Sequence, residues 1–140
     1  MTTQIADLRV GNLMTLDPVV IDPDATAAEA EDLLKTYRVS GLPVIRDGEV
    51  VGVLSQSDLV VARSSAMIAA NWPRLRVRHL MSSPAVTVHA GATIRWAAHE
   101  MLVRHIHRLV VIADDGAPIG VVTPLDLLRS LLEDVDDPIT

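Results

Sequence analysis

Two hydroxyl–aspartate pairs have a spacing that could serve either helix capping or ligand binding. Ser55 precedes Asp58 by three residues, and Thr123 precedes Asp126 by the same interval. This spacing is typical of a capping box, which stabilises a helix N-terminus. It also places a carboxylate where it can accept hydrogen bonds from both hydroxyls of a ribose, while the helix N-terminus favours a nearby phosphate. The spacing alone leaves both interpretations open.

The two pairs occupy equivalent places in an internal repeat. Leu13-Met14 recurs as Leu80-Met81, 67 positions further on. Later matches, such as Gly52 with Gly120, lie 68 positions apart because one residue is inserted in a turn. A register that holds over about fifty residues indicates that one structural unit is present twice.

Each copy is predicted to fold as β-α-β-β-α. A short β run, residues 19–21 or 86–88, leads to Thr26 or Thr93 as a helix N-cap. The helices that follow should bury residues at helical spacing, namely Ala30, Leu33, Leu34 and Tyr37 in one copy and Ile94, Ala97, Ala98, Met101 and Leu102 in the other.

Two hairpins and two final helices complete the predicted copies. Strands 42–45 and 50–54 flank an Asp-Gly turn, and strands 109–112 and 119–122 flank its longer counterpart. The final helices start at Ser55 and at Thr123, where Pro124 takes the favoured first helical position.

The domain organisation follows from the repeat. We expect repeat 1 over about residues 10–60, a linker over 61–76, and repeat 2 over about 77–129. The linker is predicted to extend the preceding helix through Ile68 and to end before Pro73. Because a unit of about fifty residues would be marginal alone, residues 1–140 should form one module of the α/β (α+β) class.

The composition excludes several classes of function. A net charge of −6 and a pI near 5.2 argue against binding nucleic acid. The absence of cysteine excludes disulfides and thiolate chemistry. No apolar run approaches the roughly 18 residues of a membrane span, and no leader is evident at the N-terminus. We therefore expect a cytoplasmic protein without membrane contact, or a soluble domain of something larger.

The five histidines lack the spacing of a helical metal site. No pair has the i, i+4 interval, and although His105 and His107 could share one face of a strand, no third ligand is evident. We therefore expect no metal site.

The ordered motifs resemble those of a tandem pair of CBS domains, a Bateman module. The resemblance rests on Asn12-Leu13-Met14, on residues 39–44 and 52–59, and on residues 120–127 of the second copy. It implies a pseudo-twofold pair with two clefts that bind AMP, ADP, ATP or S-adenosylmethionine. It also implies a homodimer, a regulatory role towards an unknown protein partner, no catalytic activity, and no required cofactor beyond the adenosyl ligand.

The resemblance further implies two binding sites, each combining the Ser/Thr-x-x-Asp motif of one repeat with the first strand and pre-strand loop of the other. One site would contain Thr123, Asp126, Val19, Val39, Ser40, Gly41 and Pro43. The other would contain Ser55, Asp58, Val86, Ile106, His107, Arg108 and Leu109.

Basic residues near the second site have two interpretations. The run from His107 to Val111 resembles the gamma subunits of AMP-activated kinase, which implies phosphate contacts by His107 and Arg108. Alternatively, both residues are solvated and complement a helix dipole. Arg38 is a weaker candidate by position alone.

Three functions remain to be distinguished. The leading hypothesis is a regulatory module that binds an adenosyl ligand. The second is a ligand-free scaffold that dimerises through the apolar residues of 59–68 and 125–132. The third is an enzyme that uses the histidines.

Overall fold

The computed structural model describes residues 8–16, 18–65 and 70–133, and the chain divides into two compact units. The continuous unit consists of Pro18–Ala85. The composite unit combines Met1–Asp17 with Val86–Thr140. Each unit has its own strands, helices and apolar core.

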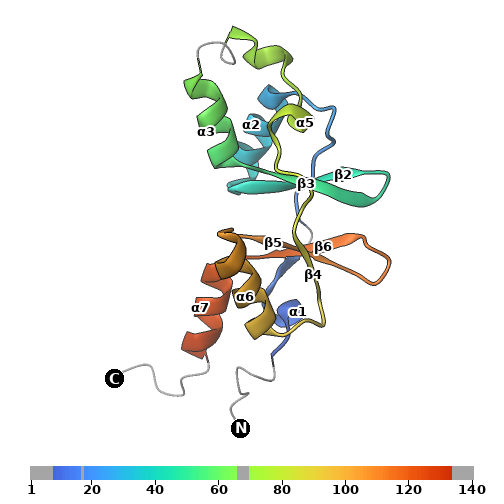
Figure 1. Ribbon diagram of the computed structural model, residues 1–140, viewed down its shortest axis with the longest axis vertical. Coiled ribbons are helices and arrows are strands. Elements are labelled where there is room, and N and C mark those ends of the chain that lie inside the picture. The colour runs from blue at the N-terminus through green and yellow to red at the C-terminus, as the bar shows by residue number, and fades with distance from the viewer. Residues whose placement is uncertain (1–7, 17, 66–69, 134–140) are drawn as a thin grey trace. The chain divides into compact units, whose positions relative to one another are not determined.

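The continuous unit is built on the hairpin of β2 (Gly41–Arg46) and β3 (Glu49–Ser55), shown in Figure 1. Its turn takes φ values of 52° at Asp47 and 81° at Gly48, as a two-residue type I′ turn requires. Helices α2 (Ala27–Tyr37) and α3 (Gln56–Ser64) pack on one side of the hairpin. A 3₁₀ turn, η2 (Trp72–Arg74), and the short α5 (Val77–Leu80) follow.

The composite unit contains a four-stranded sheet in the order β1-β6-β5-β4. The short β1 (Thr15–Leu16) follows α1 (Val10–Leu13) and pairs antiparallel with β6 (Pro118–Val122). In the same sheet β5 (Leu109–Ile112) pairs antiparallel with β6 and parallel with β4 (Thr87–His89). Helices α6 (Ile94–Arg104) and α7 (Pro124–Glu133) complete the unit.

The predicted α/β class and the repeated strand–helix order are confirmed. Thr26 and Thr93 cap α2 and α6 through their side chains, as their positions indicated. Both hairpins shift register at corresponding places, after Val44 and after Val111. In the continuous unit the first predicted strand is reduced to one parallel bridge, between Ile21 and Val44.

The compact units differ from the sequence repeats because the leading segment of each repeat, which contains α1 in the first and α5 in the second, is exchanged. The amide of Val77, at the start of the second repeat, donates to the Ala25 carbonyl at 2.9 Å. The amide of Val10, at the start of the first repeat, donates to the Ala92 carbonyl at 2.9 Å. Each repeat therefore contributes its first short helix to the unit that contains the body of the other.

Two glycines accommodate the exchanged segments at close range. A β-carbon at Gly52 would lie 2.7 Å from Met81 Sδ and 2.8 Å from the Ser82 carbonyl oxygen. A β-carbon at Gly120 would lie 2.6 Å from Met14 Sδ and 2.8 Å from the Thr15 carbonyl oxygen. Both glycines are therefore required for close packing rather than for backbone conformation.

Two apolar cores, one per unit, hold these elements. In the continuous unit Leu42, Val44 and Leu54 of the hairpin pack with buried residues of α2 and α3. In the composite unit Leu109, Val111 and Val122 of the sheet pack with Ala97 and Met101 of α6. Small and branched side chains thus fill both cores, as the composition suggested.

Three sequence predictions about helices were wrong. Tyr37 and Leu102 were predicted to be buried but are 57% and 75% exposed. The buried face of α2 ends at Leu34 and that of α6 at Met101, so both residues lie beyond it. The predicted extension of α3 through Ile68 is interrupted, since α3 ends at Ser64 and Ser65 has extended backbone. The rest of the predicted extension, 66–68, lies outside the described residues.

Replacing Gly52 by alanine should destabilise the fold by about 1–3 kcal/mol, because the new methyl group would collide with a sulfur and a backbone oxygen. Urea denaturation monitored by circular dichroism measures the change. Gly91→Ala is the matched control, since a β-carbon there meets no heavy atom within 4 Å, and it should change stability by less than about 0.5 kcal/mol. Equal stability of both variants would contradict the packing role of Gly52.

Candidate functional site

The N-terminus of α3 forms the capping box that its sequence predicted. The Ser55 amide donates to Asp58 Oδ2 at 2.8 Å, and the Asp58 amide donates to Ser55 Oγ at 3.1 Å. Asp58 is half-buried. The carboxylate is held in the first helical turn by its Oδ2 atom, so its orientation is set by the cap itself.

The pre-strand loop of the same repeat lies directly beside this helix N-terminus. The Gln56 amide donates to the Ser40 carbonyl oxygen at 2.8 Å, and Gly41 pairs with Ser55 across the hairpin. The Ile21 amide donates to the carbonyl oxygen of Pro43 at 3.0 Å, which aligns the end of the first β run with β2. Loop, first strand and helix N-terminus therefore meet within the continuous unit.

The N-terminus of α7 has a related geometry in which the carboxylate makes more contacts. Asp126 Oδ2 accepts from the Thr123 amide at 2.8 Å and from the Thr123 hydroxyl at 3.1 Å. Asp126 Oδ1 lies 3.5 Å from Nη1 of Arg129, and the aspartate side chain is only 9% exposed. Both carboxylate oxygens are thus engaged within the helix.

The basic candidates of the composite unit lie in the segment between α6 and β5. His107 is exposed and Arg108 is half-buried. Leu109, which follows them, pairs with Val122, the residue before Thr123. The Val110 amide also donates to the Val86 carbonyl oxygen at 3.4 Å. This segment therefore lies near the α7 N-terminus of its own repeat.

The structure brings together motif and loop residues from the same repeat. Ser40, Gly41 and Pro43 are grouped with Ser55 and Asp58. Likewise, Val86 and the residues leading to Leu109 are grouped with Thr123 and Asp126. Val19 and Val39 pack against the core of the continuous unit, as Val86 and Ile106 do in the composite unit. The cross-repeat combinations implied by the family resemblance stay predictions.

Sequence reasoning missed two features near the motifs. One is Arg129, whose i, i+3 spacing from Asp126 was a readable signal. The other is a cavity of about 230 Å³ between α2 and α3, lined by Glu31, Leu34, Lys35, Gln56, Leu59, Val60 and Arg63. None of the predicted site residues lines this cavity.

The histidines do not form a metal centre in the described part of the chain. No group of three or more His, Asp or Glu residues there is placed to hold a metal ion. His105 caps α6 with a φ of 54°, and His107 lies in a bend, so the two do not share a strand face as considered from the sequence. His99 stacks on Trp96 with ring centroids 5.5 Å apart.

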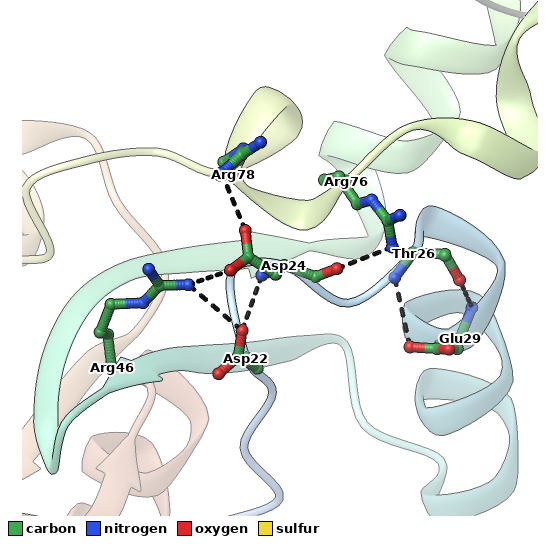
Figure 2. Close-up of polar contacts among 7 residues, drawn as sticks. All are labelled: Asp22, Asp24, Thr26, Glu29, Arg46, Arg76 and Arg78. Atoms are coloured by element: carbon green, nitrogen blue, oxygen red, sulfur yellow. Dashed lines mark hydrogen bonds and ion pairs between the residues drawn. The ribbon is translucent and has the colours of Figure 1, made fainter.

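An ionic cluster fixes the turn after the first β run of the continuous unit (Figure 2). Asp24 accepts hydrogen bonds from Arg46 and, at 2.9 Å, from Arg78, while its backbone carbonyl accepts from Arg76 at 2.9 Å. Asp22 accepts from the Asp24 amide at 2.8 Å. Because Arg76 and Arg78 flank the start of α5, the cluster anchors the exchanged segment.

The same cluster sets the protonation of Asp24. The hydrogen bond from the Arg46 guanidinium, together with the positive charges of Arg46, Arg78 and Arg76, holds the pKa of Asp24 below its ordinary value. The paired carboxylate in turn raises the pKa of Arg46. Since every cation in the cluster is matched to a carboxylate or carbonyl, its evident role is structural.

The described helices include none that is both long and apolar enough to cross a membrane.

A comparison with known families identifies the class of protein that this repeated fold represents. The family model of the CBS domain matches residues 10–65 and 77–133. These two segments cover most of the chain and contain both capping motifs. The chain therefore belongs to the CBS domain family and carries two copies of the domain in tandem.

Solved structures and curated relatives agree with this assignment. The crystal structure of CBSX2 in complex with AMP, a CBS-pair protein of Arabidopsis thaliana, is 30% identical, with a TM-score of 0.78 over 90% of this chain and 97% of that one. The CBS domain pair of protein MJ0100, in complex with 5′-methylthioadenosine and S-adenosyl-L-methionine, is 19% identical over 96% of this chain and 100% of that one. Its TM-score is 0.80, which indicates the shared fold.

The A-adding tRNA nucleotidyltransferase of Aquifex aeolicus is 27% identical over 92% of this chain. The chain spans only 15% of the length of that enzyme.

The lowered pKa of Asp24 predicts a pH-dependent contribution to stability. A carboxylate with a depressed folded pKa stabilises the fold above its unfolded pKa of about 4, and this contribution is lost as the pH falls through the folded pKa. Arg46→Gln should therefore lower the urea midpoint at pH 7, and the difference from the wild type should shrink as the pH falls below about 4.

Arg95→Gln is the control for this experiment, because Arg95 is exposed and forms no ion pair among the residues described. A difference between wild type and Arg46→Gln that persists undiminished in acid would contradict the assignment to Asp24.

Proposed function

We propose that this chain is a regulatory module that binds an adenosine-containing ligand, namely AMP, ADP, ATP or S-adenosylmethionine, and catalyses no reaction itself. The observation that carries the proposal is the carboxylate held in the first turn of α3 and again of α7, each beside the pre-strand loop of its own repeat. Membership of the CBS family and the AMP complex of CBSX2 support it.

The chemistry of binding follows from the groups at each helix N-terminus. A ribose offers two adjacent hydroxyl donors, and a carboxylate that is already oriented by its cap can accept both without further ordering. The partial positive charge of the helix N-terminus favours a phosphate close by. The half-buried apolar side chains of Val19 and Val39, or of Val86 and Ile106, would pack against the base.

Basic residues would extend the phosphate contacts in the composite unit. His107 and Arg108 stand between α6 and β5, ahead of the strand residue that pairs beside Thr123. A guanidinium can bind a phosphate through two parallel hydrogen bonds. Binding in this mode needs no metal and no second cofactor.

Calorimetric titration with AMP, ADP, ATP and S-adenosylmethionine tests the proposal. We expect saturable binding of at least one ligand, and loss of binding when Asp58 and Asp126 are both replaced by alanine. The 2′-deoxy analogue of the bound nucleotide should bind about tenfold more weakly, since it lacks one hydroxyl donor to a charged acceptor. The absence of binding and of any ligand-dependent thermal shift would contradict the proposal.

A second function, dimerisation as an interaction scaffold, is favoured by exposed apolar residues on the helices. Leu125, Leu128 and Leu132 follow one another along α7 and are 55%, 54% and 74% exposed. On α3, Val60 and Val61 are 63% and 70% exposed. Surfaces of this kind mark protein contacts, and a second copy of the chain is the proposed partner. A regulated protein would then bind the dimer.

The Leu128→Glu variant should shift the protein towards monomer, because the new charge would be buried without a partner in the contact. Analytical ultracentrifugation over a range of concentrations measures the shift. Leu16→Glu is the control, since Leu16 is a similarly exposed apolar residue, at 63%, on strand β1 rather than on a helix. If the wild-type protein stays a monomer at high concentration, the dimer proposal is wrong.

A further inference from the structure

The two aspartates of the repeated motif differ in how much acceptor capacity they leave open. Asp58 uses Oδ2 to accept from the Ser55 amide at 2.8 Å. Within the described residues, its Oδ1 atom has no hydrogen-bond or ion-pair partner. The Ser55 hydroxyl accepts from the Asp58 amide and does not donate to the carboxylate. An oriented carboxylate oxygen with open lone pairs is what a ribose diol requires.

In Asp126, by contrast, both carboxylate oxygens already have partners. Its Oδ2 accepts from both the amide and the hydroxyl of Thr123, and its Oδ1 lies 3.5 Å from Arg129 Nη1. Its side chain is 9% exposed, whereas the Arg129 side chain is 63% exposed. A ribose would have to displace the arginine or share its acceptor oxygen, and would have to reach a carboxylate that is largely buried.

The difference originates in one position of the repeat. Val61 lies three residues after Asp58, as Arg129 lies three residues after Asp126, so valine stands in the first copy where arginine stands in the second. Valine has no donor and leaves the carboxylate open. The loops before the hairpins also differ. Gly41, which pairs with Ser55 and has no side chain, corresponds to Arg108 in the second copy.

From these contacts we infer that the two motifs are unequal sites: Asp58 provides the tight ribose-binding carboxylate, and Arg129 weakens the second site by competing with the ribose for Asp126. This inference rests on the proposed adenosyl-binding function. It assigns Arg129 as a residue that sets affinity without contacting the ligand. Because Arg129 and Val61 are both well exposed, exchanging them should leave the fold intact.

Titration of the 140-residue protein with AMP and with adenosine, for the wild type and single variants, tests the inference. Asp58→Ala should weaken the tight site about tenfold or more, the loss expected for hydrogen bonds to a charged acceptor, whereas Asp126→Ala should change it less than about twofold. Thermal denaturation of each variant without ligand reports the separate cost of losing a cap.

Reciprocal exchange of the side chains is the sharper test. Arg129→Val should tighten the weaker site by about twofold to fivefold, the range that an exposed ion pair spans. Val61→Arg should weaken the tight site by a similar factor, and Val61→Met, which is long but has no hydrogen-bond donor, should not. Both effects should be the same for AMP and for adenosine, because the competition is for the ribose.

Each contrary result has a distinct meaning. If Asp126→Ala, and not Asp58→Ala, removes the tight site, the order of the two sites is reversed and the inference is wrong. If Arg129→Val weakens AMP while leaving adenosine unchanged, Arg129 binds phosphate, and its role as a competitor is overturned. If the wild type binds none of AMP, ADP, ATP, S-adenosylmethionine and adenosine, the proposed function fails and the inference fails with it.

Discussion

The close contact between a strand glycine and a methionine from the other repeat is the constraint on which the remaining structure depends. Met81 packs against Gly52 and Met14 against Gly120, and in each case a backbone oxygen lies nearly as close to the glycine as the sulfur does. These contacts hold the exchanged leading segments in place, so neither sequence repeat forms its compact unit without residues of the other. The duplicated sequence is thereby made into one interdependent pair.

The exchange of the leading segments also determines where ionic contacts secure the fold. In the continuous unit, Arg76 and Arg78 accompany α5 and are anchored by Asp24, while Arg46 reaches the same carboxylate from the hairpin. In the second copy, glycine stands at the position of Asp24 and alanine at that of Arg46, so this ionic cluster has no counterpart there. The two halves thus share a backbone plan and differ in the interactions that secure it.

The capping boxes serve folding and the proposed binding with the same atoms. One carboxylate oxygen satisfies an amide that would otherwise lack a partner at the helix N-terminus, and this bond orients the second oxygen. Whether the second oxygen is available depends on its neighbours in the next helical turn. Valine at position 61 leaves it open, and arginine at position 129 occupies it. Equivalent motifs therefore differ in the acceptor capacity that they leave open.

The sequence by itself determined the features that depend on neighbouring residues. The Asp47-Gly48 turn, the caps at Thr26 and Ser55 and the strand pairing of each hairpin follow from local rules of backbone geometry, and the repeat and its family follow from motif order. The exposure of Tyr37 and Leu102, the exchange of the leading segments and the grouping of same-repeat loops were decided by the tertiary structure. Burial and contact depend on residues far away in the chain, which helical periodicity and capping signals do not report.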